Sequence, residues 1–190
     1  YHELFDEALK RYNDKQTRKD RKIDDYYEKI RSGKQEKLFH EVIIQIGDKD
    51  NMGSETVEGQ LAAKILDEYM RGFQERNPTL RVFAAHLHLD EATPHLHIDF
   101  IPYVTGSKRG LDTRVSLKQA LSVLGFKGGT RMETELNQWV AAEKEQLASI
   151  MLEHGIGRRK AHMKSICLCL ILKSRNVQRK WRHLKSRKRT

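Results

Sequence analysis

The sequence predicts an α+β fold in which an antiparallel sheet packs against long helices. Two strand-like segments, 80–89 and 95–104, are separated by only five residues, a length that suits a hairpin. Residues 39–46 are β-branched and predict a third strand. Residues 55–76 and 131–154 carry apolar residues at helical spacing. Long helices that bury one face against a sheet are typical of the α+β class.

The remaining elements are predicted in chain order from their apolar spacing and their end signals. Residues 2–13 predict a helix, and residues 17–31 predict a mostly polar helix that ends at Ser32-Gly33. Gly47-Asp48 closes the strand 39–46, and Asn77-Pro78 ends the helix 55–76. Residues 116–124 predict a short helix. Three strands are few for a self-sufficient sheet and the chain starts at Tyr1, so we expect it to lack N-terminal strands of a longer protein.

Charge divides the chain into two parts. The formal net charge is +10, but 13 of the 36 Lys and Arg residues lie in 157–190, which holds no acidic residue. This leaves residues 1–156 with 23 basic against 26 acidic residues. Both cysteines, Cys167 and Cys169, also lie in the basic part, which excludes a disulfide framework or a cysteine-based zinc site in 1–156. No apolar run is long enough to span a bilayer and no secretory signal is present, so we expect a cytoplasmic protein without a membrane partner.

The basic segment 157–190 is predicted to be a disordered tail next to a domain at 1–156. One interpretation is a DNA-binding tail. We favour a translational frameshift near Ile156 and Gly157, because suitable codons read one nucleotide earlier give a charge-balanced sequence that continues the helix 131–154. A truncated start and a shifted end would together indicate a decayed gene.

Histidines cluster around the predicted hairpin. His95 and His97 are two residues apart on one strand, so both side chains leave the same face. An antiparallel return brings His88 beside them, and three imidazole nitrogens can then bind one metal ion with positions left for substrate. His86 faces the same side as His88, so the spacing alone leaves it open as the third ligand. Asp99 and Glu91 are candidates to hydrogen-bond a ligating ring, and Glu91 is also a candidate ligand.

The string HLDEATPHLH, residues 88–97, resembles the metal motif of the Mob/Pre plasmid mobilisation and recombination proteins. These are relaxases of the histidine–hydrophobe–histidine class. A looser similarity covers residues 1–156, including RYNDKQTRKDRKIDDYY, FQERNP and ATPHLHIDFIPY. The resemblance implies a partial relaxase-like domain at 1–156, with His88, His95 and His97 as ligands of Mn²⁺ or Mg²⁺ and Glu91 assisting. His86 falls outside the motif.

The resemblance also implies a reaction and a partner. The expected activity is strand-specific nicking of single-stranded DNA by transesterification at a plasmid origin of transfer, as in conjugation and plasmid recombination. The nucleophile in this group is a histidine of an N-terminal motif that is not found after Tyr1, so we expect it upstream. Four tyrosines are possible substitutes, and the apolar helical stripes around three of them predict a core role instead. They are Tyr1, Tyr12, Tyr26 and Tyr27.

Basic residues suggest where DNA would bind. Lys108, Arg109 and Arg114 follow the second histidine strand and are predicted to contact phosphates. Arg18 and Arg21 belong to a basic patch on the first two helices, for which a solvated face is the alternative. Two other functions stay open at this point: a catalytically inactive DNA-binding remnant or replication accessory protein, and a metal-dependent hydrolase unrelated to DNA.

Overall fold

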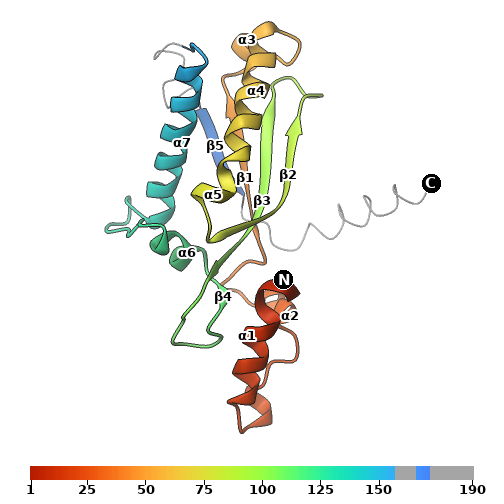
Figure 1. Ribbon diagram of the computed structural model, residues 1–190, viewed down its shortest axis with the longest axis vertical. Coiled ribbons are helices and arrows are strands. Elements are labelled where there is room, and N and C mark those ends of the chain that lie inside the picture. Colours follow the sequence, from red (N-terminus) through yellow and green to blue (C-terminus); the bar gives the residue numbers. More distant parts are fainter. Residues whose placement is uncertain (157–165, 172–190) are drawn as a thin grey trace, which may run out of the picture.

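The computed structural model describes residues 1–156 and 166–171, and it has the predicted α+β fold. Figure 1 shows an elongated molecule in which α4 and α7 run along the sheet, while α1 and α2 form the end below it. The elements are α1 (His2–Asp14), η1 (Lys19–Arg21), α2 (Tyr26–Ser32), β1 (His40–Ile46), α3 (Lys49–Met52), α4 (Val57–Arg71), α5 (Phe73–Arg76), β2 (Leu80–His88), β3 (His95–Val104), β4 (Arg114–Val115), α6 (Leu117–Val123), α7 (Glu135–Glu153) and β5 (Ile166–Ile171).

The sheet is antiparallel with the strand order β2-β3-β1-β5, and β4 pairs with the end of β3. The predicted hairpin is confirmed, since β2 and β3 pair directly, with a bulge between Val82 and Ala84. The long-range partner of β3 is β1, in a register that sets Ile43 opposite His97. The histidine strand β3 is therefore flanked on both sides.

One face of the sheet carries the main core. Val42, Ile44 and Ile46 alternate along β1 and are fully buried. Leu96, Ile98 and Phe100 do the same along β3, and they join one cluster with residues of α4, α6 and α7. The long helices α4 and α7 therefore cover this face, and the intervening residues of each strand point to the opposite face.

A second, smaller core lies around α1 and α2. Phe5, Tyr26, Ile101 and Val115 are buried in it. The Tyr26 hydroxyl accepts a hydrogen bond from the backbone N–H of Val115 at 3.1 Å, so α2 is tied to β4. This core fixes the lower end of the molecule in Figure 1 to the end of β3.

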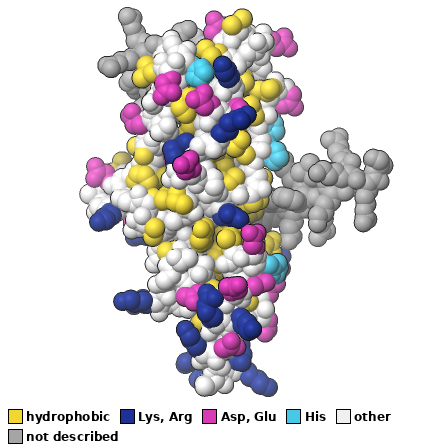
Figure 2. All heavy atoms as spheres, in the orientation of Figure 1, with side chains coloured by type: hydrophobic (Ala, Val, Ile, Leu, Met, Phe, Trp, Pro, Cys, Tyr) yellow, Lys and Arg dark blue, Asp and Glu magenta, His cyan; other side chains and the backbone are white. Residues whose placement is uncertain are grey.

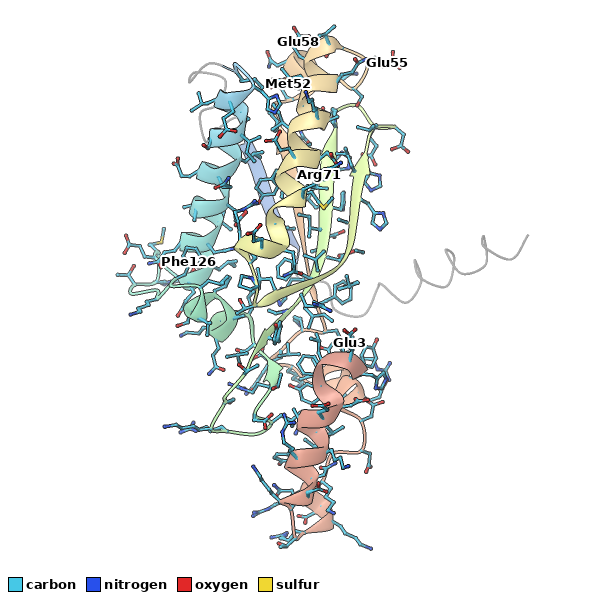
Figure 3. The ribbon with its side chains drawn as sticks, viewed as in Figure 1. Glu3, Met52, Glu55, Glu58, Arg71 and Phe126 are labelled. Atoms are coloured by element: carbon cyan, nitrogen blue, oxygen red, sulfur yellow. The ribbon has the colours of Figure 1, made fainter. Side chains whose placement is uncertain are left out.

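Two helix predictions are wrong in their extent. Residues 17–31 form only the short turn η1 and α2, because the Asn13 side chain hydrogen-bonds both the N–H and the carbonyl of Ile23 and holds the connection extended. The predicted helix 55–76 divides into α4 and α5 at Gly72. Figure 3 shows Met52, Glu55 and Glu58 gathered where α4 begins, at the end of the molecule farthest from α1.

A buried polar network joins α4, α5 and α7. Glu143 of α7 is 5% exposed and accepts hydrogen bonds from the Tyr69 hydroxyl and, at 2.9 Å, from the Asn77 amide. The Arg76 guanidinium pairs with the same carboxylate at 3.2 Å. The Trp139 indole N–H donates to Asn77 at 2.8 Å, which completes the network. Burial and the neighbouring Glu143 carboxylate raise the pKa of Tyr69 well above its usual value.

The structure differs from the expected disordered tail at residues 166–171. These residues form β5, which pairs with β1 at the edge of the sheet. Residues 166–171 are an apolar run, which explains why this segment can pair with an exposed strand edge. Residues 157–165 and 172–190 lie outside the described residues, and the frameshift hypothesis stays a prediction for the nucleotide sequence. Among the described helices, none has the length and apolarity required to cross a membrane.

Candidate metal centre and nucleic-acid interface

The histidine cluster lies on the face of the sheet opposite α4 and α7. His95 and His97 alternate with the buried Leu96 and Ile98, so the strand period sends both imidazoles away from the core. The register of the hairpin places His88 opposite His95. Two neighbouring strands therefore present three imidazoles to one space, as the sequence predicted.

The three rings are close enough to share an ion. One ligand nitrogen from each of His88, His95 and His97 lies within 4.8 Å of the others. The ring centroids are 5.1 Å apart for His88 and His95, 4.8 Å for His88 and His97, and 5.0 Å for His95 and His97. Nitrogens about 2.1 Å from a common metal ion are about 3–4 Å from one another, so small side-chain adjustments bring this group to coordination distance.

Hydrogen bonds set the orientation of two rings. The Nδ1 atom of His95 lies 3.0 Å from the Thr93 carbonyl, and Nδ1 of His97 lies 2.8 Å from the Glu41 carboxylate. Because both partners are acceptors, the neutral form of each ring would carry its proton on Nδ1 and keep the Nε2 lone pair for a metal ion. The donor set and its tautomers therefore fit a divalent cation.

Glu41 is a residue of the candidate site that sequence reasoning missed. It is 4% exposed on β1 and stands opposite Asp99 in the strand register. The sequence pattern suggested Asp99 and Glu91 as candidates to hydrogen-bond a ligating histidine, and the structure adds Glu41, whose carboxylate is bonded to His97. The signal in the sequence was an acidic residue within the mostly apolar strand FHEVIIQI.

Glu91 lies beside the cluster on the loop between β2 and β3. Its carboxylate is 3.8 Å from Nε2 of His95, the nitrogen that has the free lone pair. The loop is fastened to the turn before α4, because the Ser54 hydroxyl donates to the Glu91 carbonyl and the Ser54 N–H donates to the Ala92 carbonyl at 3.2 Å. Glu91 is thus held where it can approach an ion bound by the histidines.

His86 is placed on the same face but outside this group. It stands opposite His97 in the hairpin register and its side chain is exposed. Within the described residues, the cluster able to hold a metal consists of His88, His95 and His97 without His86. The geometry therefore agrees with the three ligands that the family resemblance implied.

The four tyrosines considered as nucleophiles lie with the second core, away from the histidines. Tyr26 is buried in it, and Tyr1 and Tyr12 pack against it. The Tyr1 hydroxyl donates to the Leu38 carbonyl at 2.9 Å, and burial raises the pKa of Tyr1 above its usual value. Tyr27 contacts the Tyr1 ring edge-on. Their positions fit the core role that the helical stripes predicted.

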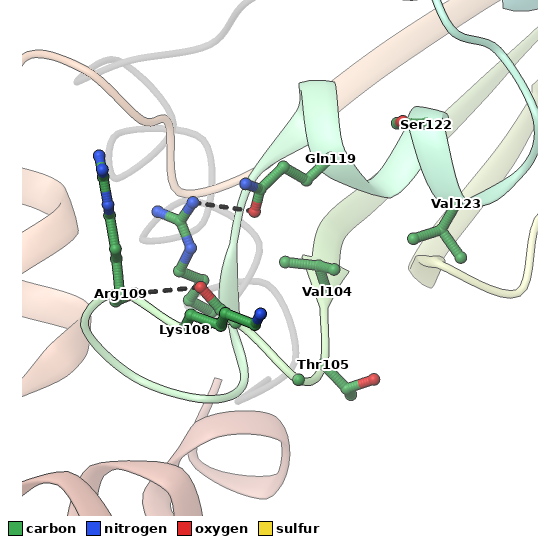
Figure 4. Close-up of a pocket in the computed structure, with 10 residues that line it drawn as sticks. Val104, Thr105, Lys108, Arg109, Gln119, Ser122 and Val123 are labelled. Carbon is green, nitrogen blue, oxygen red and sulfur yellow. Dashed lines mark hydrogen bonds between the residues drawn. The ribbon is translucent and has the colours of Figure 1, made fainter.

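The predicted DNA-binding residues lie in two places. Lys108, Arg109 and Arg114 line a groove of about 580 Å³ between the loop after β3 and α6 (Figure 4). Arg18 precedes η1 and Arg21 is its last residue, and Arg18 forms an ion pair with Asp20 at 2.7 Å. Figure 2 shows Lys and Arg side chains, mixed with acidic ones, over the lower end of the molecule. The metal centre and these basic groups are therefore distinct parts of the surface.

The comparison with family models decides the classification. The model described as plasmid recombination enzyme, Mob_Pre, matches residues 1–161. The chain belongs to this family. The match covers most of the chain and includes the whole histidine hairpin, α7 and both cores. Membership in the plasmid recombination enzyme family makes DNA the partner of this protein. Comparisons with curated proteins and with solved structures found no match.

Proposed function

We propose that this member of the plasmid recombination enzyme family nicks one DNA strand at a plasmid origin of transfer, by metal-dependent transesterification. The observation that carries the proposal is the convergence of His88, His95 and His97 on the face of the sheet opposite α4 and α7. Three neutral imidazoles would leave the ion its full positive charge and open positions for a phosphate.

The residues around the site would prepare it for an anionic substrate. Glu41 and the Thr93 carbonyl hold the protons of His97 and His95 on Nδ1, so both rings keep the correct nitrogen for the ion. Glu91 would assist from its loop as a further ligand or by binding a metal-bound water. A Mn²⁺ or Mg²⁺ ion at this place would polarise the scissile phosphate and stabilise its developing charge.

The side chain of His88 is 39% exposed, so the cluster opens to solvent and to a DNA strand. In the proposed reaction a protein nucleophile attacks the phosphorus, the bond to the 3′ oxygen breaks, and the 5′ phosphate becomes linked to the protein. The released 3′-hydroxyl can reverse the reaction and reseal the strand. We assign the nucleophile to none of the four tyrosines, because they serve the second core.

The test uses the full-length gene product, Mn²⁺ and a supercoiled plasmid that carries the cognate origin. We expect conversion to the open-circular form, with protein attached to the 5′ end, and loss of this conversion in His95→Ala and in EDTA. A plasmid without the origin is the control. DNA binding without nicking by the full-length protein would overturn the proposal and would favour a DNA-binding role without catalysis.

A further inference from the structure

We propose that the groove between residues 105–112 and α6 binds a phosphate group of the DNA backbone, at a site separate from the histidine cluster. The inference rests on the proposed function for its choice of DNA as the ligand. It adds a second point of contact, which holds the strand at a distance from the reacting phosphate.

The side chains of the groove suit an anion. Its lining includes three cations, Lys108, Arg109 and Arg114, and no acidic residue. Gln119 and Ser122 of α6 add neutral hydrogen-bonding groups on the opposite wall. Figure 4 shows Lys108 and Arg109 of the loop on one side of this space and Gln119, Ser122 and Val123 of α6 on the other. A phosphate there would meet positive charge from one wall and hydrogen-bond donors from the other.

The cations are not equivalent. Arg114 donates to the Gln119 amide oxygen at 2.8 Å, so its guanidinium is held in place as part of the wall. Lys108 and Arg109 are exposed, and neither side chain forms an ion pair or a hydrogen bond with another of the described residues. Their charges would therefore be available for a ligand, and they are the residues to test.

The loop that carries these two cations is held in shape before any ligand binds. Gly106 and Gly110 adopt φ values of 71° and 72°, a region that other residues rarely enter, and so allow the tight path of the loop. The Ser107 N–H donates to the Asp112 carbonyl at 2.9 Å and closes the loop.

A salt bridge then anchors the loop to α1. Two guanidinium nitrogens of Arg11 donate to the two carboxylate oxygens of Asp112 at 2.8 and 2.9 Å. This paired geometry fixes direction as well as distance. A loop that is already ordered loses less conformational entropy on binding, which favours a binding role over a solvated charged surface.

Distance separates the groove from the metal centre. The groove begins at Val104, seven residues along β3 from His97. At about 3.3 Å per residue this amounts to about 23 Å, so one phosphate cannot reach both places. At about 3.4 Å per nucleotide, a stacked strand that contacted both places would need at least about seven nucleotides between them.

The lining also indicates which part of DNA is recognised. It contains no aromatic side chain on which a base could stack. Val123, at its rim, is 64% exposed and provides only a small apolar surface. The ligand class that fits is the phosphodiester backbone, whose contacts position a strand without reading its sequence.

The first experiment measures binding of a labelled 30-nucleotide single strand by fluorescence anisotropy, in EDTA so that the histidine site takes no part. We compare Lys108→Ala/Arg109→Ala with Lys118→Ala/Lys127→Ala, which removes the same charge from exposed positions outside the groove. We expect the groove variant to bind roughly five- to tenfold more weakly at low salt. The slope of log affinity against log salt concentration should become shallower by about 1.4, because each of the two lost phosphate contacts accounts for about 0.7. The control pair should change both values by less than half as much.

A second measurement locates the strand. The photo-crosslinking residue p-benzoylphenylalanine replaces Val123 at the groove or, as a control, the exposed Val57 at the start of α4. We expect DNA crosslinks from position 123 and few from position 57. Equal binding by both charge variants, or equal crosslinking from both positions, would overturn the inference. Because no metal is present, this outcome is independent of whether the full-length protein nicks the origin.

Discussion

Glu41 on β1 holds Nδ1 of His97 on β3 at 2.8 Å, and this contact joins two segments 56 residues apart in the chain. Almost the whole Glu41 side chain is buried, at 5% exposure, whereas His97 is 20% exposed toward the open face. The carboxylate thus orients the His97 ring through Nδ1, and Nε2 stays available to the site. This arrangement is known to orient metal-binding histidines and to increase their basicity.

Replacing Glu41 with Gln tests this support. The amide oxygen of the variant can still accept the Nδ1 proton, so the fold and the ring position should persist while the negative charge is lost. We expect Mn²⁺ affinity to fall about 10- to 100-fold, measured by titration with electron paramagnetic resonance detection. The melting temperature without metal serves as the control for folding. An unchanged affinity in a folded variant would contradict the role of Glu41.

The sequence predicted the part of the site that depends on local geometry. A strand period of two and a five-residue connection suffice to bring His88 to His95 and His97. Glu41 could not be placed in the same way, because its position depends on the long-range pairing of β1 with β3, and β1 could pair with either edge of the hairpin. The main helices could be predicted from the sequence because each has a full apolar face at helical spacing.

The failures have the same physical origin. The segment 17–31 has good helical spacing, yet the side chain of Asn13 binds the backbone of Ile23 and replaces helical hydrogen bonds with a clamp. The helical spacing of residues 131–154 also gives no sign that Glu143 is buried, because its partners come from α4 and from the end of α5. In both cases a side-chain contact outside the helix itself decides the structure, and helical spacing does not contain such contacts.

His86 and His88 form a matched pair for testing the ligand set. Both leave the same face of β2, and only His88 belongs to the group within 4.8 Å. We expect His88→Ala to reduce Mn²⁺ affinity by about 100-fold or more and His86→Ala to change it by less than about threefold. Isothermal titration calorimetry at pH 7.5 measures both. Equal losses in the two variants would show that the cluster extends to His86.

Gly59 allows the turn before α4 to approach the helix closely. A Cβ atom at this position would lie 1.9 Å from the Gly53 carbonyl oxygen, and Gly53 precedes Ser54, which fastens the Glu91 loop. We therefore expect Gly59→Ala to destabilise the protein by about 1–3 kcal/mol in urea denaturation and to weaken Mn²⁺ binding. Gly129→Ala is the control, because nothing lies within 4 Å of its Cβ position. Full stability of Gly59→Ala would show that the turn relaxes freely.

The Glu143 network predicts a large loss of stability. Glu143→Ala would leave the Arg76 guanidinium, 24% exposed, without its carboxylate and the Tyr69 hydroxyl without its acceptor. The Asn77 amide would lose one of its two acceptors and keep the Phe73 carbonyl. Removing one partner of a buried ion pair costs about 3–5 kcal/mol, so we expect a loss of this size in urea denaturation. Glu145→Ala, on the exposed side of the same helix, should change stability by less than about 0.5 kcal/mol. Comparable effects of the two variants would contradict the structural role of the network.

His40 predicts that stability decreases in acid. It is 3% exposed, and burial, together with the nearby Lys37 charge, lowers its pKa to about 4. The unfolded chain, with a pKa near 6.5, binds this proton first as the pH falls, so stability decreases between about pH 6.5 and 4. At pH 4 the loss from this group is roughly 3 kcal/mol relative to pH 7.

The variant His40→Phe removes the titrating group and keeps a ring against Phe100, whose centroid is 5.9 Å from that of His40. We expect its free energy of unfolding to vary less with pH than that of the original protein across this interval, as measured by urea denaturation at half-unit steps. Above pH 7 the two curves should run parallel, because the neutral imidazole then contributes no proton uptake in either state. Parallel curves between pH 4 and 6.5 as well would mean that His40 is protonated as easily in the folded chain as in the unfolded one.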